Sequence, residues 1–279
     1  MYLDLGDGVQ LFYTIAGEYT GKGKVVVLLH GFTGSSESWK SISQELTSSC
    51  KVILPDLLGH GKSSAPEEHT LYRMEAAARQ LALLLDRSTD EPVHFVGYSM
   101  GGRLALYFAM VYPEYVHSLV LESSSPGLAT EAERSARQRA DERLAETILS
   151  DGIEAFVDHW EALPLFATSL NLSQAVLQQQ RRIRLANRPV GLAGSLRGMG
   201  TGAQPSLWNR LGTLTIPVLL IAGEFDAKFL EINRRMEHDL PNAMLTVISE
   251  AGHTTHLEQP VRFTQQIKEF WDRLEPGTT

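Results

Sequence analysis

The sequence predicts an α/β protein whose mostly parallel, doubly wound sheet is interrupted by a helical insertion. Short apolar runs with turn signals around them recur along the chain, and helical segments lie between them. One long stretch in the middle is helical in character and contains no strand-like run. Alternating strands and helices are typical of a layered α/β fold, and the middle stretch indicates an addition to it.

The strands are predicted from two patterns of apolar residues. Residues 3–5 and 9–14 alternate around Asp7 and Gly8, which favours an antiparallel pair at one edge of the sheet. The later runs are continuously apolar and rich in Val, Ile and Leu, which is typical of strands buried on both faces of a parallel sheet. These runs are residues 25–29, 52–54, 93–96, 119–121, 218–221 and 245–248.

Three helices are predicted outside the insertion. Residues 71–86 are amphipathic, with Leu81, Leu84 and Leu85 on one side. Residues 100–111 are apolar nearly all round, which predicts a helix buried at the centre of the fold. Residues 260–274 begin with proline, which is favoured at the first position of a helix.

The helical insertion is predicted between residues 126 and 204, where Ala, Glu, Arg and Gln dominate. A crossover between parallel strands needs only about a dozen residues, so we expect a cap over one end of the sheet, with an ordinary helical crossover as the alternative. The expected division is a core of residues 1–125 and 205–279 and a cap of residues 126–204. Helices are expected in the cap at residues 130–149, 152–160, 172–186 and 190–199.

The composition excludes several functional classes. The formal net charge is −8, which argues against a nucleic-acid-binding surface. No apolar run is long enough to cross a bilayer, and the first residues lack the basic and apolar regions of a secretory signal. Cys50 is the only cysteine, and we expect it to be a packing residue rather than a catalytic thiol. These features predict a cytoplasmic protein without membrane insertion and without an intramolecular disulfide.

The sequence G-Y-S-M-G-G at residues 97–102 is the sharpest local signal. It follows the apolar run 93–96 and opens the buried helix. Ser99 would therefore stand on a tight strand-to-helix turn, where the helix dipole favours developing negative charge and side chains at the flanking glycines would block the turn. This G-x-S-x-G context resembles the nucleophile elbow of the α/β-hydrolase family.

The sequence H-G-F-T-G at residues 30–34 follows the run 25–29. Resemblance to the same family implies an oxyanion loop here, with the backbone N–H groups of Phe32 and Met100 facing the developing charge. A glycine-rich turn without a catalytic role is the alternative. The turn at residues 56–64 also matches the family, which implies a structural role, and His60 in it has no nearby partner at the spacing of metal ligands.

An acidic residue and a histidine follow later strands in the order that this fold expects. Asp226 comes after the run 218–221, and His253 comes after the run 245–248. Both would lie just beyond the carboxyl ends of parallel strands, at the edge of the sheet that also carries Ser99. The sequence therefore predicts a catalytic triad of Ser99, Asp226 and His253, with Glu224 as the alternative acid and His256 as the alternative base.

The placement of arginine indicates the chemistry of the substrate. Arg103 lies one helical turn after Ser99 in an otherwise apolar helix, where a cation is costly unless it meets an anion. No lysine occurs between Lys62 and Lys228, and the insertion is rich in arginine. Most of these arginines are expected on solvated helix faces beside acidic residues, but a guanidinium also binds carboxylates in a forked geometry. This placement therefore favours a small molecule that carries carboxylates as the ligand.

The whole chain resembles the 2-succinyl-6-hydroxy-2,4-cyclohexadiene-1-carboxylate synthase family of menaquinone biosynthesis. Besides the motifs around Phe32 and Ser99, the resemblance includes S-P-G-L at residues 125–128, in which Ser125 departs mildly from the usual Gly or His. It also includes R-Q-R-A-D at residues 137–141, the pair Trp160 and Phe166, and G-E-F-D-A-K-F at residues 223–229.

This resemblance implies a lyase. The family's substrate, 2-succinyl-5-enolpyruvyl-6-hydroxy-3-cyclohexene-1-carboxylate, carries three carboxylates and loses pyruvate by elimination, without addition of water. In that scheme Ser99 acts as a general base whose proton is drawn off by His253, while Asp226 orients His253. The oxyanion loop would then hold the enolate that forms at the ketone of the substrate.

The resemblance also implies a set of substrate-binding residues by motif position. Carboxylates of the substrate would be bound by Arg103, Arg137 and Arg184, and Arg181 or Arg182 is the alternative to Arg184. The pocket would be lined by Tyr98, Trp160 and Phe166.

Two other functions fit part of the pattern. A carboxylesterase or a carbon–carbon bond hydrolase on the same scaffold would use Ser99 as a nucleophile, although a neutral ester gains nothing from Arg103. A ligand-binding receptor of the hydrolase fold would keep the triad beside a largely apolar pocket. The sequence contains no phosphate loop, dinucleotide fingerprint or metal-ligand cluster, so we expect no cofactor, no metal and no nucleic-acid partner.

Overall fold

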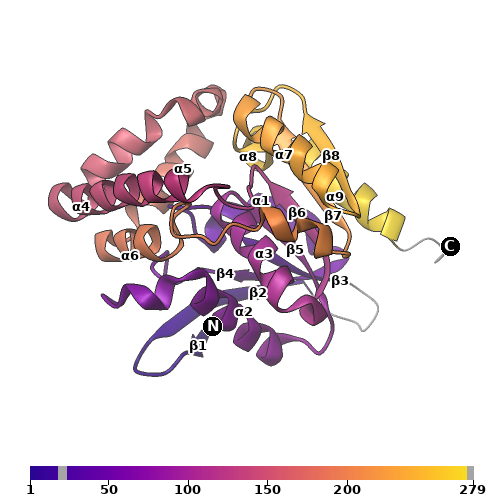
Figure 1. Ribbon diagram of the computed structural model, residues 1–279, viewed down its shortest axis with the longest axis horizontal. Coiled ribbons are helices and arrows are strands. Elements are labelled where there is room, and N and C mark those ends of the chain that lie inside the picture. The colour runs from indigo at the N-terminus through magenta and orange to yellow at the C-terminus, as the bar shows by residue number, and fades with distance from the viewer. Residues whose placement is uncertain (18–23, 275–279) are drawn as a thin grey trace.

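The computed structural model describes residues 1–17 and 24–274. Its centre is an eight-stranded sheet in the order β1-β2-β4-β3-β5-β6-β7-β8 (Figure 1). Strand β2 pairs antiparallel with β1 and β4, and all other pairs are parallel. The predicted parallel sheet with an antiparallel edge pair is confirmed. The strands are β1 (Tyr2–Asp4), β2 (Gln10–Ala16), β3 (Lys24–Leu29), β4 (Cys50–Pro55), β5 (Val93–Tyr98), β6 (Val116–Glu122), β7 (Val218–Gly223) and β8 (Ala243–Ile248).

Helices cover both faces of the sheet, as expected for a doubly wound fold. Side chains of α2 (Met74–Ser88), α3 (Met100–Val111) and α7 (Ala227–Asp239) pack into one apolar core. Side chains of α1 (Lys40–Leu46) and α9 (Pro260–Leu274) pack into a second core on the opposite face. Shorter helical turns are η1 (Ser36–Trp39), η2 (His69–Tyr72), η3 (Pro113–Tyr115), η6 (Trp208–Thr213) and α8 (Thr255–Glu258).

Three of the helices outside the insertion were predicted from the sequence, and two others were not. Helices α3 and α9 have the predicted bounds, whereas α2 begins three residues later than predicted because η2 precedes it. Helix α1 was not predicted, because it is only seven residues long. Helix α7 was not predicted either; it is mostly polar, and of its residues only Asn233 and Met236 are fully buried.

The insertion between β6 and β7 is entirely helical. It contains α4 (Glu131–Glu161), α5 (Gln174–Leu185) and α6 (Pro189–Met199), with the turns η4 (Pro164–Phe166) and η5 (Thr168–Asn171). These helices lie together at the left of Figure 1. Helix α4 is broken at Gly152, where φ is 84°, so it corresponds to the two helices predicted at 130–149 and 152–160. The side chains of Ile148, Phe156, Leu192 and neighbouring residues form a small apolar core within the insertion.

The insertion is attached over the carboxyl ends of β3 and β4. The buried side chain of Asn187 donates a hydrogen bond to the carbonyl oxygen of Thr33 (2.8 Å) and accepts one from the backbone N–H of Gly61 (3.0 Å). Phe32 packs against the apolar core of the insertion. The loops that follow the strands are therefore enclosed between the sheet and the insertion helices.

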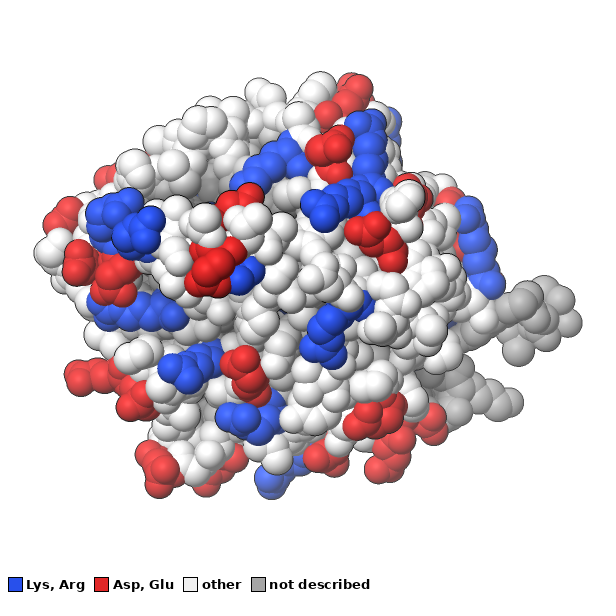
Figure 2. Space-filling view, viewed as in Figure 1, with Lys and Arg blue, Asp and Glu red and all other residues white. Residues whose placement is uncertain are grey.

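The surface carries charges of both signs. On the face shown in Figure 2, acidic and basic side chains of the described residues are interspersed rather than gathered into one field. Among residues 1–17 and 24–274, no helix combines the length and the apolar character that crossing a bilayer requires.

Candidate active site

Ser99 lies on a strained turn between β5 and α3. Its φ and ψ angles are 50° and −105°, a conformation that costs free energy in any residue with a side chain. A Cβ atom on Gly101 would lie 2.2 Å from the carbonyl oxygen of Leu29, and one on Gly102 would lie 1.9 Å from Ser124 Oγ. A Cβ atom on Gly97 would lie 2.6 Å from the Cα atom of Gly102, so the close packing of this turn requires glycine on both sides of Ser99. The turn exposes the Ser99 side chain at the carboxyl edge of the sheet.

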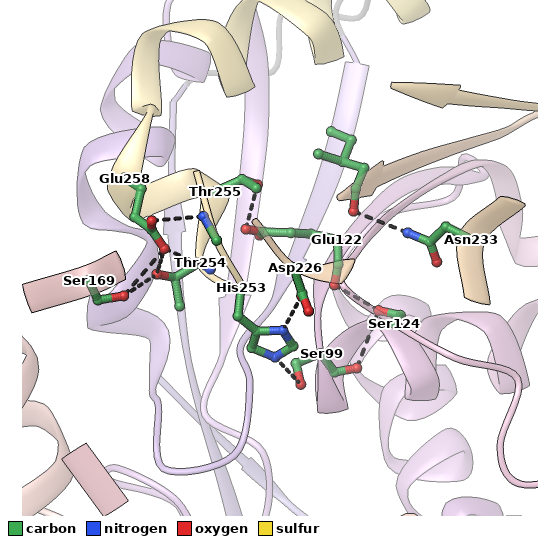
Figure 3. A network of polar contacts seen from close by, with 12 residues as sticks. Ser99, Glu122, Ser124, Ser169, Asp226, Asn233, His253, Thr254, Thr255 and Glu258 are labelled. Atoms are coloured by element: carbon green, nitrogen blue, oxygen red, sulfur yellow. Dashed lines mark hydrogen bonds and ion pairs between the residues drawn. The ribbon is translucent and has the colours of Figure 1, made fainter. Parts of the chain in front are cut away.

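His253 and Asp226 converge on Ser99 from the ends of two other strands. His253 Nδ1 lies 2.7 Å from Asp226 Oδ2, and His253 Nε2 lies 3.4 Å from Ser99 Oγ (Figure 3). With Nδ1–H donating to the carboxylate, Nε2 is left to accept the hydroxyl hydrogen of Ser99. The longer contact is at the outer limit of a hydrogen bond.

A close approach of two loops brings Asp226 and His253 together. A Cβ atom on Gly223, at the end of β7, would lie 2.1 Å from the carbonyl oxygen of Gly252, which precedes His253. The loops after β7 and β8 are thus in direct backbone contact. Both side chains are buried, with 6% of Asp226 and 3% of His253 exposed. The Asp226 carboxylate is shielded from water and can hold one orientation of the imidazole.

The alternative acid and the alternative base have other partners. The exposed Glu224 accepts a hydrogen bond from the backbone N–H of Glu250 (3.0 Å). His256 Nδ1 lies 2.8 Å from Glu122 Oε2. Among the described residues, Asp226 and His253 are therefore the acid and histidine that line up with Ser99.

The segments predicted to form an oxyanion hole lie beside Ser99. Met100 is the first residue of α3, so the helix does not use its backbone N–H, and the helix dipole favours an anion there. Phe32 lies in the loop after β3, which His30 holds: its Nδ1–H donates to the carbonyl oxygen of Gly31 (2.8 Å) and its Nε2 accepts the backbone N–H of Leu57 (2.9 Å). Burial lowers the pKa of His30, which keeps it neutral for these two roles.

A cavity of about 210 Å³ opens next to Ser99, between the strand ends and the insertion. Nine of the predicted site residues line it: Phe32, Tyr98, Ser99, Met100, Arg103, Arg137, Trp160, Phe166 and His253. The rings of Trp160 and Phe166 are 5.8 Å apart, and Phe166 lies 6.2 Å from the ring of His253. Burial, and next to it the charge of Glu122, raises the pKa of Tyr98 well above its usual value, so its phenol stays neutral.

Arg103 carries a positive charge into the wall of this cavity. Only 8% of it is exposed. Its Nη1 donates to two neutral oxygens, the carbonyl of Met199 (2.8 Å) and Oε1 of Gln204 (2.8 Å). Burial, together with the nearby charge of Arg137, lowers the pKa of Arg103 to about 10, and Asp141 acts in the opposite direction. The guanidinium thus remains protonated at neutral pH.

Arg137 is the second cation of the cavity wall. Its Nε donates to Asp141 Oδ1 at 2.6 Å, and its side chain is 42% exposed, compared with 5% for Asp141. Asp141 therefore bonds to Arg137 and acts on Arg103 only through its charge. The resulting excess of one positive charge favours an anionic ligand.

The structure places Arg184 outside the main cavity. It lines a smaller neighbouring cavity on the other side of Tyr98 and Phe166, and its Nη1 pairs with Glu161 Oε1 at 2.9 Å. The alternatives have partners elsewhere and do not line the main cavity either: Arg181 pairs with Asp158 and Glu161, and Arg182 bonds to Gln179.

The cavity also contains residues that the sequence did not single out. Lys228 and Phe229, from the first turn of α7, line it opposite the insertion. Their signal was their position directly after Asp226 and the return of lysine after a long stretch without any. Gln204 was also missed, because only the fold shows that it bonds to Arg103. In the described part of the chain, no group of three or more His, Cys, Asp or Glu side chains is arranged to hold a metal ion.

Comparisons with known proteins agree with this geometry. A family model described as alpha/beta hydrolase fold matches residues 24–260. A protein of Bacillus subtilis (strain 168), provisionally named 2-succinyl-6-hydroxy-2,4-cyclohexadiene-1-carboxylate synthase, is 46% identical over 96% of this chain and 97% of its own length. The synthase of that name from Citrobacter koseri is 33% identical over 88% of this chain and 92% of its own length.

Among solved structures, MenH from S. aureus is similar along almost the whole fold. It is 36% identical, has a TM-score of 0.90, and the match covers 94% of this chain and 98% of that chain. The family model and the relatives cover most of the sequence, including the insertion and every strand that borders the cavity. The chain therefore belongs to the alpha/beta hydrolase fold family and, within it, to the 2-succinyl-6-hydroxy-2,4-cyclohexadiene-1-carboxylate synthase family.

Proposed function

We propose that this protein is a lyase that eliminates pyruvate from 2-succinyl-5-enolpyruvyl-6-hydroxy-3-cyclohexene-1-carboxylate to give 2-succinyl-6-hydroxy-2,4-cyclohexadiene-1-carboxylate. The names and the coverage of the relatives support this reaction. The observation that carries the proposal in this chain is the buried guanidinium of Arg103, one helical turn from Ser99. A site for neutral esters would gain nothing from that charge, whereas a polycarboxylate gains a charge-assisted hydrogen bond.

The triad serves as a base in this proposal. His253 draws the hydroxyl proton from Ser99, whose oxygen takes the proton from the ring carbon next to the succinyl carbonyl. Electrons then move through the ring and break the bond to the enolpyruvyl oxygen. The proton returns to the departing group, which becomes pyruvate, so no water is consumed. Asp226 stabilises the imidazolium that forms in between.

Two backbone N–H groups hold the enolate oxygen of the substrate in this proposal. The donors are those of Phe32, in the loop after β3, and of Met100, at the start of α3. Preorganised donors of this kind stabilise charge that develops in the transition state. Arg103 and Arg137 bind carboxylates of the substrate, and Lys228 offers a further cation on the opposite wall. Arg184 attracts the carboxylates of the substrate from the neighbouring cavity, where its guanidinium carbon lies 5.7 Å from the centre of the Phe166 ring.

Residues 126–204 act as a cap and residues 1–125 and 205–279 as the core in this proposal. Support comes from the separate apolar core of the insertion and from its contribution of Arg137, Trp160 and Phe166 to the cavity wall. Excluding water above Ser99 favours elimination over hydrolysis, because the enolate is protected from competing reactions.

The proposal is tested by an assay for pyruvate coupled to lactate dehydrogenase, with the enolpyruvyl substrate and no metal added. We expect the wild-type protein to release pyruvate and the Ser99→Ala variant to be slower by about 10⁴-fold or more. The Ser118→Ala variant is the matched control. Ser118 lies near the amino end of β6, away from the edge of the sheet that carries Ser99, and bonds to His94. Wild-type protein that releases no pyruvate contradicts the proposal.

Ester hydrolysis is the second candidate, and the triad geometry favours it. A serine hydroxyl at the N-terminus of α3, with His253 and Asp226 in line, also suits an acyl-enzyme mechanism. The same preparation is therefore assayed with p-nitrophenyl acetate. Rapid ester turnover without pyruvate release assigns the protein to the hydrolases. Tight binding of the enolpyruvyl substrate with neither reaction assigns it to the ligand-binding proteins of this fold.

A further inference from the structure

Glu122 is a fully buried carboxylate at the end of β6 that the triad does not include. Its relative exposure is 0%. Its Oε1 accepts hydrogen bonds from Thr255 Oγ1 (2.7 Å) and from the backbone N–H of His256 (3.0 Å), and its Oε2 lies 2.8 Å from His256 Nδ1. Figure 3 shows this carboxylate reaching the segment that directly follows His253. The carboxylate therefore holds residues 255 and 256, which follow His253 in the chain.

The backbone of the same residue holds the serine. The carbonyl oxygen of Glu122 accepts the backbone N–H of Ser99 at 2.8 Å, and it also accepts a hydrogen bond from Ser124 Oγ at 2.9 Å. Glu122 thus bonds through its main chain to the turn that carries Ser99. Through its side chain it bonds to the segment that follows His253. Ser99 and His253 come from distant parts of the sequence, and Glu122 connects the backbone segments that carry them.

Aromatic packing stiffens the connection. The ring of His256 lies 4.5 Å from the ring of Trp39 and 4.9 Å from that of Tyr98. The ring of Tyr98, next to Ser99 in the chain, also lies 5.4 Å from that of His253. A shift of His256 would therefore be transmitted to both residues of the reacting pair.

A buried histidine–carboxylate pair adds little to the stability of a fold, because desolvation of the charge offsets the attraction, and apolar residues of equal volume often do as well. The position of Glu122, between the turn that carries Ser99 and the segment that follows His253, indicates a different role. We propose that Glu122 is a positioning residue that sets the separation between Ser99 Oγ and His253 Nε2. The inference rests on the proposed function only in taking Ser99 and His253 as the reacting pair.

The test compares Glu122→Ala and Glu122→Gln with the matched control Ser118→Ala. Ser118 lies in the same strand, is equally buried, and bonds to His94 (2.8 Å) at the opposite end of the sheet. Each variant is measured for pyruvate release and for the rate at which a fluorophosphonate labels Ser99, at a temperature where circular dichroism shows the protein folded. The labelling rate reports the reactivity of Ser99 without the natural substrate.

We expect Glu122→Ala to lower kcat by about 30- to 100-fold and the labelling rate by a similar factor, because a misplacement of about 1 Å has effects of this size. KM should stay within about 2-fold of the wild-type value, since Glu122 does not line the cavity. Glu122→Gln keeps an oxygen for Thr255 and the His256 N–H, so it should recover most of the loss. Ser118→Ala should lower the melting temperature and leave both rates unchanged.

Three results would overturn the inference. These are unchanged kcat and labelling in a folded Glu122→Ala protein, a change confined to KM, or an equal loss of kcat in Ser118→Ala. If Glu122→Ala does not fold, Glu122→Gln decides: a 3- to 10-fold lower kcat with unchanged KM supports the inference, and an unchanged kcat overturns it. Wild-type protein that is labelled but releases no pyruvate overturns the proposed function, while the labelling rates still decide the role of Glu122.

Discussion

The edge of the sheet and the insertion build opposite walls of the same cavity in different ways. At the edge, Asp226 and His253 are buried and held by loops in backbone contact. In the insertion, Arg137 is 42% exposed and leans on Asp141, one helical turn away. In the proposed function, the groups that move a proton over a fixed distance therefore follow the strand ends. Arg137, which would attract a charged ligand over a longer range, lies on a helix at the surface. Arg103 links the two, because it belongs to α3 and bonds to Met199 of the insertion.

The sharpest test of this difference removes one buried carboxylate charge from each side. Asp226→Asn should lower kcat by about 10³- to 10⁴-fold, because an amide favours the wrong tautomer of His253 and cannot stabilise its imidazolium. Asp141→Asn removes an equally buried charge from the insertion and should change kcat by less than about 10-fold, because Asp141 touches Arg137 rather than the triad. Steady-state kinetics of pyruvate release measure both. Similar losses in the two variants would show that the two walls do not differ in this way.

A second comparison concerns the two arginines of the cavity. Arg103→Lys keeps the positive charge but loses the planar guanidinium, which can donate two parallel hydrogen bonds. The smaller ammonium group also leaves the carbonyl oxygen of Met199 or Oε1 of Gln204 without its donor. We expect kcat/KM to fall by about 30- to 100-fold, with kcat and KM both affected, because the carboxylate contact also orients the ring. Arg137→Lys also keeps the charge, and it should lower kcat/KM by only about 3- to 10-fold, because the side chain is partly exposed and water can replace the hydrogen bonds that are lost. An Arg137→Lys effect larger than that of Arg103→Lys would reverse the assigned order.

The strand ends could be predicted from sequence because local rules determine them. An apolar run followed by a glycine-flanked serine, or by Gly252 and a histidine, defines both the strand and the side chain that follows it. The parallel sheet then brings Ser99, Asp226 and His253 to one edge without further information. Their mutual contacts agree with the predicted triad, although the role of each residue stays a prediction.

The insertion could be predicted only in outline. Its helices follow from composition, but the direction in which each helix turns its side chains depends on packing that no local pattern encodes. Arg184 illustrates this, because its pairing with Glu161 and its place in the neighbouring cavity follow from how α5 packs against α4. Glu122 illustrates the same limit within the core. A glutamate that ends an apolar strand is visible in the sequence, but its bonds to Thr255 and His256 join residues more than 130 positions apart.

The smallest effect on activity is expected at the amino end of the sheet, far from both walls. His94 is buried in β5, where its Nδ1 lies 2.8 Å from Ser118 Oγ, and burial lowers its pKa to about 3, with a smaller contribution from His117. In the unfolded chain the pKa is about 6.5. Between these pH values only the unfolded state binds the extra proton. The contribution of His94 to the free energy of unfolding is therefore fully present above pH 6.5 and decreases as the pH falls towards 3.

His94→Gln removes this titration and keeps a polar side chain beside Ser118. The loss of stability between pH 7 and pH 5 in urea unfolding should therefore shrink by about 1–2 kcal/mol, since each histidine contributes at most about 1.4 kcal/mol per pH unit. The exposed His238 supplies a control for the substitution itself, and His238→Gln is unfolded in urea under the same conditions. Pyruvate release at pH 7 should be unchanged in both variants. An unaltered pH dependence in His94→Gln would mean that the ring takes up its proton over the same pH range in the folded and the unfolded chain. A loss of kcat would extend the catalytic influence of the sheet to its amino end.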